Sequence, residues 1–190
     1  MKKWASTVLL FFAIVTGCVP TLNPIYTDKD LIFDPALLGT WGSDDPREKW
    51  VFEKTNEKSY KLKQTDSEGL TAEFDTRLVR LGDYKFLDLI VTNIDEKYIK
   101  LNGFAAFSLV PAHLVLQVHE LRPKLKLSAM NPDWVKEWLD KNPKSLEHRK
   151  LGDDRYVITA STKELQKFVL QHADEEGLFA GPHELTREKD

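Results

Sequence analysis

The stretch Leu70-Thr71-Ala72-Glu73-Phe74-Asp75-Thr76-Arg77-Leu78 decides the fold of this chain. Apolar or small residues occupy every second position, and polar or charged residues occupy nearly all the positions between them. Successive side chains of a β-strand point to opposite faces of its sheet, so this period of two predicts a strand with one buried face. A helix would instead place its apolar residues three or four positions apart.

Similar runs lie on both sides of this strand, separated by short segments that favour turns. Asp66-Ser67-Glu68-Gly69 precedes the strand and Gly82-Asp83 follows it. The further predicted strands are Lys49–Glu53, Tyr60–Lys63, Tyr84–Val91, Lys97–Leu101, Phe104–Leu109, Leu114–Val118, Lys124–Ser128 and, as the last strand, Tyr156–Thr159. Consecutive strands with short turns favour an antiparallel meander that closes into a barrel or packs as a sandwich.

Two helices interrupt or follow these strands. Asn131-Pro132 provides an N-cap and a proline at the first helical position, and apolar residues then recur at helical spacing, which predicts a helix over residues 132–141. Ser161 and Glu164 have the spacing of a capping box, which predicts a second helix over residues 162–172. We expect residues 173–190 to form a polar C-terminal tail.

The first residues have the pattern of an export signal. Lys2 and Lys3 are followed by an almost wholly apolar stretch from Ala5 to Val15 and by the small residues Thr16 and Gly17. Because the apolar run stops at Pro20, it is shorter than the ~20 residues that a membrane-spanning helix needs. Residues 1–17 are therefore predicted to be a signal peptide.

Val15-Thr16-Gly17-Cys18 resembles the lipobox of bacterial lipoproteins, in which the signal is cut before the cysteine and the cysteine thiol receives a diacylglycerol. Cys18 is the one cysteine of the chain. The resemblance implies lipidation at Cys18, a location in the bacterial cell envelope and a tether over residues 18–36. Val19 after the cysteine resembles the pattern sorted to an outer membrane, where the protein would face the periplasm.

The composition of the chain limits the classes of partner and metal site that we expect. The chain has 190 residues, 27 basic and 30 acidic side chains and a formal net charge of −3. With 42% hydrophobic and 30% charged residues it is expected to fold, with one main domain over residues 37–172. Nucleic acid is not expected as a partner, because phosphate binding requires clustered Lys and Arg. A single cysteine also excludes an intramolecular disulfide and multi-cysteine metal sites.

Leu38-Gly39-Thr40-Trp41, just before the first long strand, resembles the Gly-x-Trp signature of lipocalins, which are eight-stranded barrels. The helix after the last strand also fits that family. The resemblance implies a mainly β, antiparallel lipocalin-like barrel of about eight strands with two short helices near the C-terminus. The helix at 132–141 is extra, and no Thr-Asp-Tyr motif follows.

Three segments also resemble bacterial hypothetical proteins with no assigned activity. They are Phe86-Leu87-Asp88-Leu89, Leu109-Val110-Pro111-Ala112-His113 and Thr159-Ala160-Ser161-Thr162-Lys163-Glu164-Leu165-Gln166. This likeness supports a family of secreted barrels and implies no mechanism.

The barrel interpretation favours a binding protein for a small apolar or amphipathic ligand, needing no cofactor and no metal. The candidate ligand-binding residues are Trp41, Trp50, Tyr60, Phe74, Phe86, Asp88 and His113. Large aromatic side chains line ligand cavities in barrels but also fill cores. Asp88 lies in a hydrophobic strand, where a buried carboxylate would be a candidate acid or base.

Two alternatives stay open. One is a structural or assembly lipoprotein that contacts envelope proteins through its surface. The other is a periplasmic hydrolase, which would need Ser108 close to His113 or Asp88, although no Gly-x-Ser-x-Gly motif surrounds this serine.

Overall fold

The computed structural model describes residues 18–94, 109–152, 155–179 and 181–188 of the chain. The predicted signal peptide and the predicted strand at 97–101 lie outside the described residues, as does nearly all of the strand predicted at 104–109. The strands are β1 (Pro20–Thr21), β2 (Leu31–Ile32), β3 (Gly39–Gly42), β4 (Lys49–Asn56), β5 (Ser59–Thr65), β6 (Thr71–Leu81), β7 (Tyr84–Ile94), β8 (His113–Glu120), β9 (Lys124–Ala129), β10 (His148–Leu151), β11 (Arg155–Ile158) and β12 (His183–Arg187). The helices are the 3-10 turns η1 (Asp28–Asp30) and η2 (Pro35–Leu37) and the α-helices α2 (Pro132–Lys141) and α3 (Thr162–His172).

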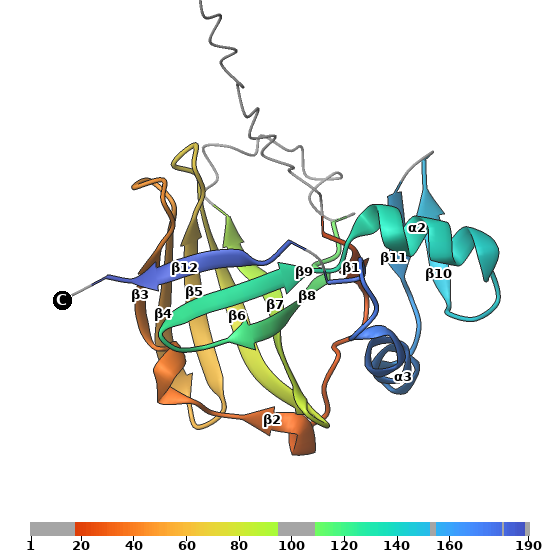
Figure 1. Ribbon diagram of the computed structural model, residues 1–190, viewed down its shortest axis with the longest axis horizontal. Coiled ribbons are helices and arrows are strands. Elements are labelled where there is room, and N and C mark those ends of the chain that lie inside the picture. Colours follow the sequence, from red (N-terminus) through yellow and green to blue (C-terminus); the bar gives the residue numbers. More distant parts are fainter. Residues whose placement is uncertain (1–17, 95–108, 153–154, 180, 189–190) are drawn as a thin grey trace, which may run out of the picture.

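Eight strands form a closed antiparallel barrel, which confirms the predicted fold class (Figure 1). Each of β3 to β8 pairs with the next strand in the chain, and β12 pairs with both β9 and β3 and so closes the ring. The pairing in which Leu78 lies opposite Leu87 keeps the alternation seen in the sequence of β6, because a register slip of one residue would reverse every side chain.

One end of the barrel carries the β3–β4 and β5–β6 turns, at the top of Figure 1, and we call it the mouth. The opposite end carries η2 and the turns after β4, β6 and β8, and we call it the closed end. The barrel strands have between 4 and 11 residues, and the longer strands place several side chains along the inner face of the barrel.

A second layer lies outside the barrel, on the right of Figure 1. The strands β10 and β11 continue the sheet through β1, which pairs in parallel with β11 and antiparallel with the first residues of β8. The helices α2 and α3 pack with this layer, and both begin as predicted. The Asn131 side chain accepts from the backbone N–H groups of Asp133 and Trp134, and Ser161 and Glu164 form the capping box.

The hydrophobic core therefore has two parts, one on each face of β6, β7 and β8. The interior cluster fills the barrel and contains Leu37, Trp41, Phe52, Tyr60, Leu62, Leu78, Leu87, Leu89, Leu116, Val118, Leu121, Leu125, Leu127 and Leu185. The exterior cluster lies between the barrel wall and the helices, and its members on the wall include Val79, Leu81, Phe86 and Val115.

Two segments differ from the sequence prediction. Residues 18–36, predicted to be a tether, pack on the barrel: Val19 and Ile25 are buried, and β1 and β2 pair with barrel strands. Within the predicted tail at 173–190, His183–Arg187 forms β12, the last strand of the barrel, whereas the strand at Tyr156 lies outside the ring. Both segments are held in place by pairing with strands that are distant in the chain. Their own strands are short, so the sequence shows no periodic pattern by which to detect them.

Candidate functional site

The structure divides the candidate ligand-binding residues between the two faces of the barrel wall. Trp41 and Tyr60 are fully buried in the interior cluster, and Trp50 and Phe74 are half-buried against it. Phe86 belongs to the exterior cluster, and Asp88 and His113 share its face of β7 and β8. The seven residues therefore do not line a single cavity.

Large side chains fill the middle and the closed end of the barrel. Tyr60, Leu62, Leu78 and Leu125 have no exposed surface, and Trp41 retains only 1%. The Trp41 indole Nε1 donates to the carbonyl of Leu37 at 2.9 Å, which ties the ring to η2. A ligand could enter this part of the barrel only by displacing packed side chains, which costs several kcal/mol.

The mouth is less completely filled. Trp50, Phe74, Leu114 and Ala129 are half-buried and pack on the interior cluster from the mouth ends of β4, β6, β8 and β9. Below them the hydroxyl of Thr76 is buried and makes no hydrogen bond within the described residues. A buried polar atom without a partner is a point where a ligand or a water molecule gains a hydrogen bond.

Polar residues stand at the rim of the mouth. Glu48, in the β3–β4 turn, accepts a weak contact from Trp50 Nε1 at 3.4 Å, and its carboxylate lies 3.1 Å from Nε2 of His183 on β12. This places an acidic and a titratable side chain next to a half-buried indole. An apolar layer with a few polar groups at its edge is the usual composition of a small-molecule site.

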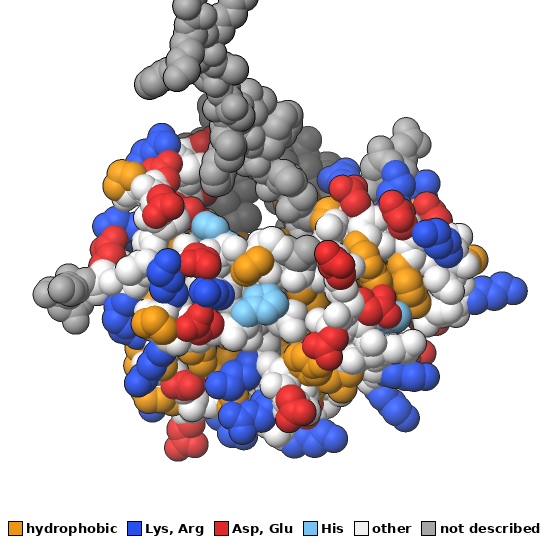
Figure 2. All heavy atoms as spheres, viewed as in Figure 1, with side chains coloured by type: hydrophobic (Ala, Val, Ile, Leu, Met, Phe, Trp, Pro, Cys, Tyr) orange, Lys and Arg blue, Asp and Glu red, His pale blue; other side chains and the backbone are white. Residues whose placement is uncertain are grey.

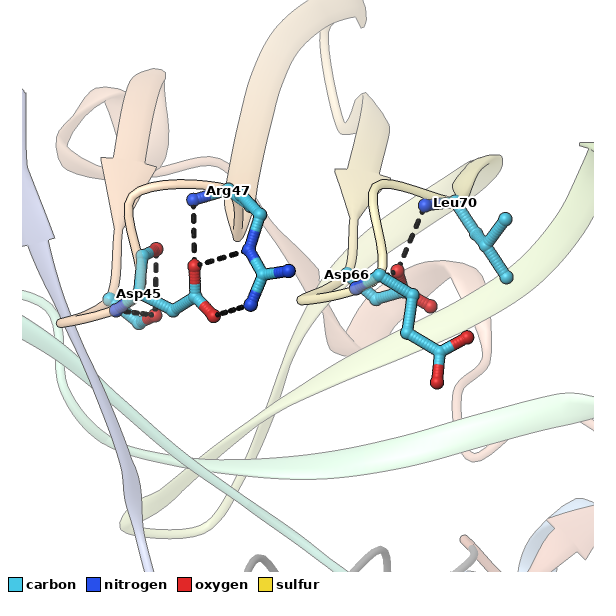
Figure 3. Close-up of polar contacts among 6 residues, drawn as sticks. Asp45, Arg47, Asp66 and Leu70 are labelled. Atoms are coloured by element: carbon cyan, nitrogen blue, oxygen red, sulfur yellow. Dashed lines mark hydrogen bonds and ion pairs between the residues drawn. The ribbon is translucent and has the colours of Figure 1, made fainter.

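Two turns beside the mouth are held by carboxylates (Figure 3). Asp45 accepts two hydrogen bonds from the Arg47 guanidinium, at 3.0 and 2.7 Å, and these bonds and the backbone N–H of Arg47 lower the pKa of Asp45 to about 2. Asp66 accepts from the backbone N–H of Leu70 at 2.9 Å. These acidic residues therefore hold the two turns beside the mouth.

Asp88 and His113 form a second polar site, on the exterior face. The Asp88 carboxylate is 1% exposed, accepts from the backbone N–H of Ile25 at 2.9 Å and lies 2.6 Å from Nδ1 of His113. Ile25 is held in turn by Gln166 of α3, whose amide donates to the Ile25 carbonyl at 2.8 Å. Asp88 thus joins β7, β8 and the segment at 18–36.

The electrostatic effect of this buried carboxylate reaches Tyr26. Burial raises the pKa of the Tyr26 hydroxyl, and the negative charge of Asp88 raises it further. An imidazole oriented by a buried carboxylate has the arrangement of a general base. Ser108, the nucleophile of the hydrolase hypothesis, lies outside the described residues. The described contacts of Asp88, with Ile25 and His113, are all explained by its role in joining β7, β8 and the segment at 18–36.

Arg187 is a site residue that the sequence analysis did not identify. Its guanidinium lies 4.6 Å from the centre of the Trp41 ring and donates to the carbonyls of Ala36 and Leu38, so it covers the closed end of the barrel. Gly39 makes room for it: a Cβ atom at Gly39 would lie 2.7 Å from Arg187 Nη1. The sequence feature that points to this place is the Gly39-Thr40-Trp41 motif, because Arg187 packs on Trp41 and occupies the space beside Gly39.

Cys18 lies at the mouth end of the barrel. It is half-buried, packs on the interior cluster and comes two residues before Pro20, which pairs with Leu114. Burial raises the pKa of its thiol, so the free thiol is less reactive than an exposed one.

Comparisons with protein-family models, with curated proteins and with solved structures found no match to this chain. Among the described residues, no helix is long and apolar enough to cross a membrane. In the same residues, His, Cys, Asp and Glu side chains do not gather in a group of three that could hold a metal ion.

Proposed function

We propose that this protein is a lipid-anchored barrel of the bacterial cell envelope that binds a small apolar or amphipathic molecule at the mouth of the barrel. The observation that carries the proposal is the mouth layer of Trp50, Phe74, Leu114 and Ala129, which is half-buried above a filled core. The Thr76 hydroxyl, which has no hydrogen-bond partner among the described residues, lies below this layer, and Glu48 and His183 lie at its rim. These groups suit a ligand with an apolar body and a polar end.

The likeness of residues 15–18 to a lipobox supports anchoring, and Cys18 itself packs on the interior cluster at the mouth end. A lipid on Cys18 would keep the mouth close to the bilayer, where apolar and amphipathic molecules are concentrated. Two or more acyl chains hold a protein stably, since each buried methylene contributes ~0.8 kcal/mol.

The filled core limits the size of the ligand. Because Tyr60, Leu62 and Leu78 are completely buried, the barrel admits part of a lipid chain or a small molecule rather than a whole long chain. Full burial of one such side-chain-sized apolar group stabilises a complex by about 2 kcal/mol.

Native mass spectrometry tests ligand binding, using protein purified from its membrane and then mixed with lysophosphatidylcholine. We expect retained lipid, and we expect Trp50→Ala to lower its retention about tenfold because the indole contributes the largest apolar surface of the mouth. Val51→Ala is the matched control, since Val51 is the next residue of β4 and faces the other way. Equal retention by the two variants, or no retained lipid in the parent protein, would overturn the binding proposal.

Incorporation of radiolabelled palmitate tests the anchor. The parent protein should be labelled and Cys18→Ala should not. Equal labelling of both proteins, or of neither, would refute lipidation at Cys18.

One observation favours an assembly lipoprotein as the second candidate. Leu109 and Val110 are 62% and 73% exposed in the connection before β8, outside the filled barrel. Exposed neighbouring apolar residues are common in protein interfaces. Cross-linking in intact cells from a photoreactive residue at Val110 should then capture a discrete protein partner, and it should do so whether or not Trp50 is replaced.

A further inference from the structure

The closed end of the barrel carries an open cavity that the proposed ligand site does not use. Its volume is about 690 Å³, and it is lined by Pro35, Ala36, Trp41, Arg122, Pro123 and Arg187. These residues come from η2, from β3, from the β8–β9 turn and from the end of β12, on the left side of Figure 1. Cavities of this size accommodate small molecules.

Arg187 is held in a fixed orientation at this cavity. Stacking on Trp41 and bonds to the carbonyls of Ala36 and Leu38 occupy one face and two N–H groups of its guanidinium. A guanidinium has five N–H donors, so three remain for another acceptor. Backbone carbonyls do not neutralise its charge, and within the described residues no ion pair joins Arg187 to a carboxylate.

Arg122 provides a second positive charge from the β8–β9 turn. Its side chain is exposed and lines the same cavity, and in the described part of the chain it forms no hydrogen bond or ion pair. Asp34, the residue just before η2, does not pair with either arginine. Its carboxylate accepts a hydrogen bond from the Ala36 N–H at 2.9 Å and lies 4.0 Å from Lys85 Nζ. Two positive charges therefore face one cavity that, among the described residues, is lined by no acidic side chain.

The remaining walls are apolar. Pro35 and Pro123 have no backbone N–H to offer and present rings to the cavity. Guanidinium groups bind carboxylates in a bidentate manner, and a flat apolar body can pack on proline rings. The two kinds of wall thus match the two parts of an organic acid.

We propose that the closed-end cavity binds a small organic carboxylate, with the carboxylate between Arg122 and Arg187 and the apolar body against Pro35 and Pro123. None of the residues that line this cavity belongs to the mouth layer, so the site is distinct from the proposed ligand site, although Trp41 of the cavity pairs with Trp50 of the mouth on the neighbouring strand. The proposed site also explains why residue 39 is a glycine, because a side chain there would displace the Arg187 guanidinium.

Amide chemical-shift mapping by NMR tests this inference, with benzoate as the probe and benzamide as its uncharged analogue. We expect saturable shifts at residues 36–39, at 121, 122 and 124, and at 186–187 with benzoate, and at least tenfold weaker binding of benzamide, since a hydrogen bond to a charged group contributes about 1.5–3 kcal/mol. Shifts at the mouth instead of the closed end would overturn the proposal and would leave the mouth proposal standing.

Arg122→Gln separates charge from folding, because Arg122 is exposed and has no described partner that its replacement would strand. This variant should keep the parent amide spectrum away from the turn and should bind benzoate about tenfold more weakly. The matched control is Arg155→Gln, an exposed arginine on β11 outside the cavity, and it should bind like the parent. Equal affinity of the parent and Arg122→Gln would refute the site.

Discussion

Replacing Gly39 by alanine tests the most constrained point of the closed end. Gly39 has a φ of +107°, which L-residues rarely adopt, and its added Cβ would lie 2.7 Å from Arg187 Nη1. The backbone strain costs about 1–2 kcal/mol. Displacing Arg187 removes two hydrogen bonds to carbonyls at about 1 kcal/mol each and a cation–π contact of about 0.5–1 kcal/mol. We therefore expect Gly39→Ala to lower the free energy of unfolding by about 3–5 kcal/mol.

Urea unfolding followed by tryptophan fluorescence measures this change. Gly82→Ala is the control, because Gly82 also has a positive φ, of +58°, but no atom lies within 4 Å of its added Cβ, so only the strain of about 1 kcal/mol remains. Gly39→Ala should also cost only that strain when Arg187 is already alanine. A loss no larger than that of Gly82→Ala, or an unchanged loss in the Arg187→Ala background, would refute the proposed role of Gly39.

Three further predictions concern the mouth, the exterior site and the closing strand. The pKa of Asp45 should rise from about 2 toward 3.8 in Arg47→Ala, as followed by carboxyl NMR; since the folded-state pKa is depressed, the stabilisation by this pair is complete above pH 3.8 and is lost as the pH falls toward 2. Asp88→Ala should destabilise the fold by about 2–4 kcal/mol and speed hydrogen exchange at the Ile25 amide, which it leaves buried without an acceptor; unchanged exchange at Ile25 would contradict the bond. Deleting residues 181–190 should abolish cooperative thermal unfolding in near-UV circular dichroism, because it removes β12 and buried Leu185; a sharp transition in the shortened chain would show that the barrel does not depend on β12.

The sequence was sufficient to predict the barrel because most of its strands carry their own pattern. Thr71–Leu78 of β6 alternates between apolar or small and polar residues, and β4, β5 and β9 have recognisable short runs bounded by turns. β12 lacks such a pattern, because Leu185 is its one buried residue. The residues opposite β12, such as Leu125 of β9 and Trp41 of β3, are distant in the chain. Its position is determined by the two strands on either side of it.

The candidate site was predicted less completely, for a reason visible in β7. Both faces of Phe86–Leu89 are buried, one by the interior cluster and one by the exterior cluster, so the sequence of this strand does not reveal which side chains point into the barrel. For this reason the sequence groups Phe86 and Asp88 with interior residues, whereas both lie on the exterior face. The cavity at Arg122 and Arg187 depends on the meeting of a turn and a terminal strand, which no local pattern records.

The insertion of α2, β10, β11 and α3 between the seventh and eighth barrel strands has a consequence for the order of folding. β12 pairs with β3 across more than 140 residues, as in the Thr186–Gly42 pair, so ring closure is a contact of very high sequence separation. During synthesis the chain emerges from its N-terminus, and seven strands are therefore available long before the eighth. Until β12 pairs with both of them, β3 and β9 are exposed edges of an open sheet, and only this pairing closes the barrel.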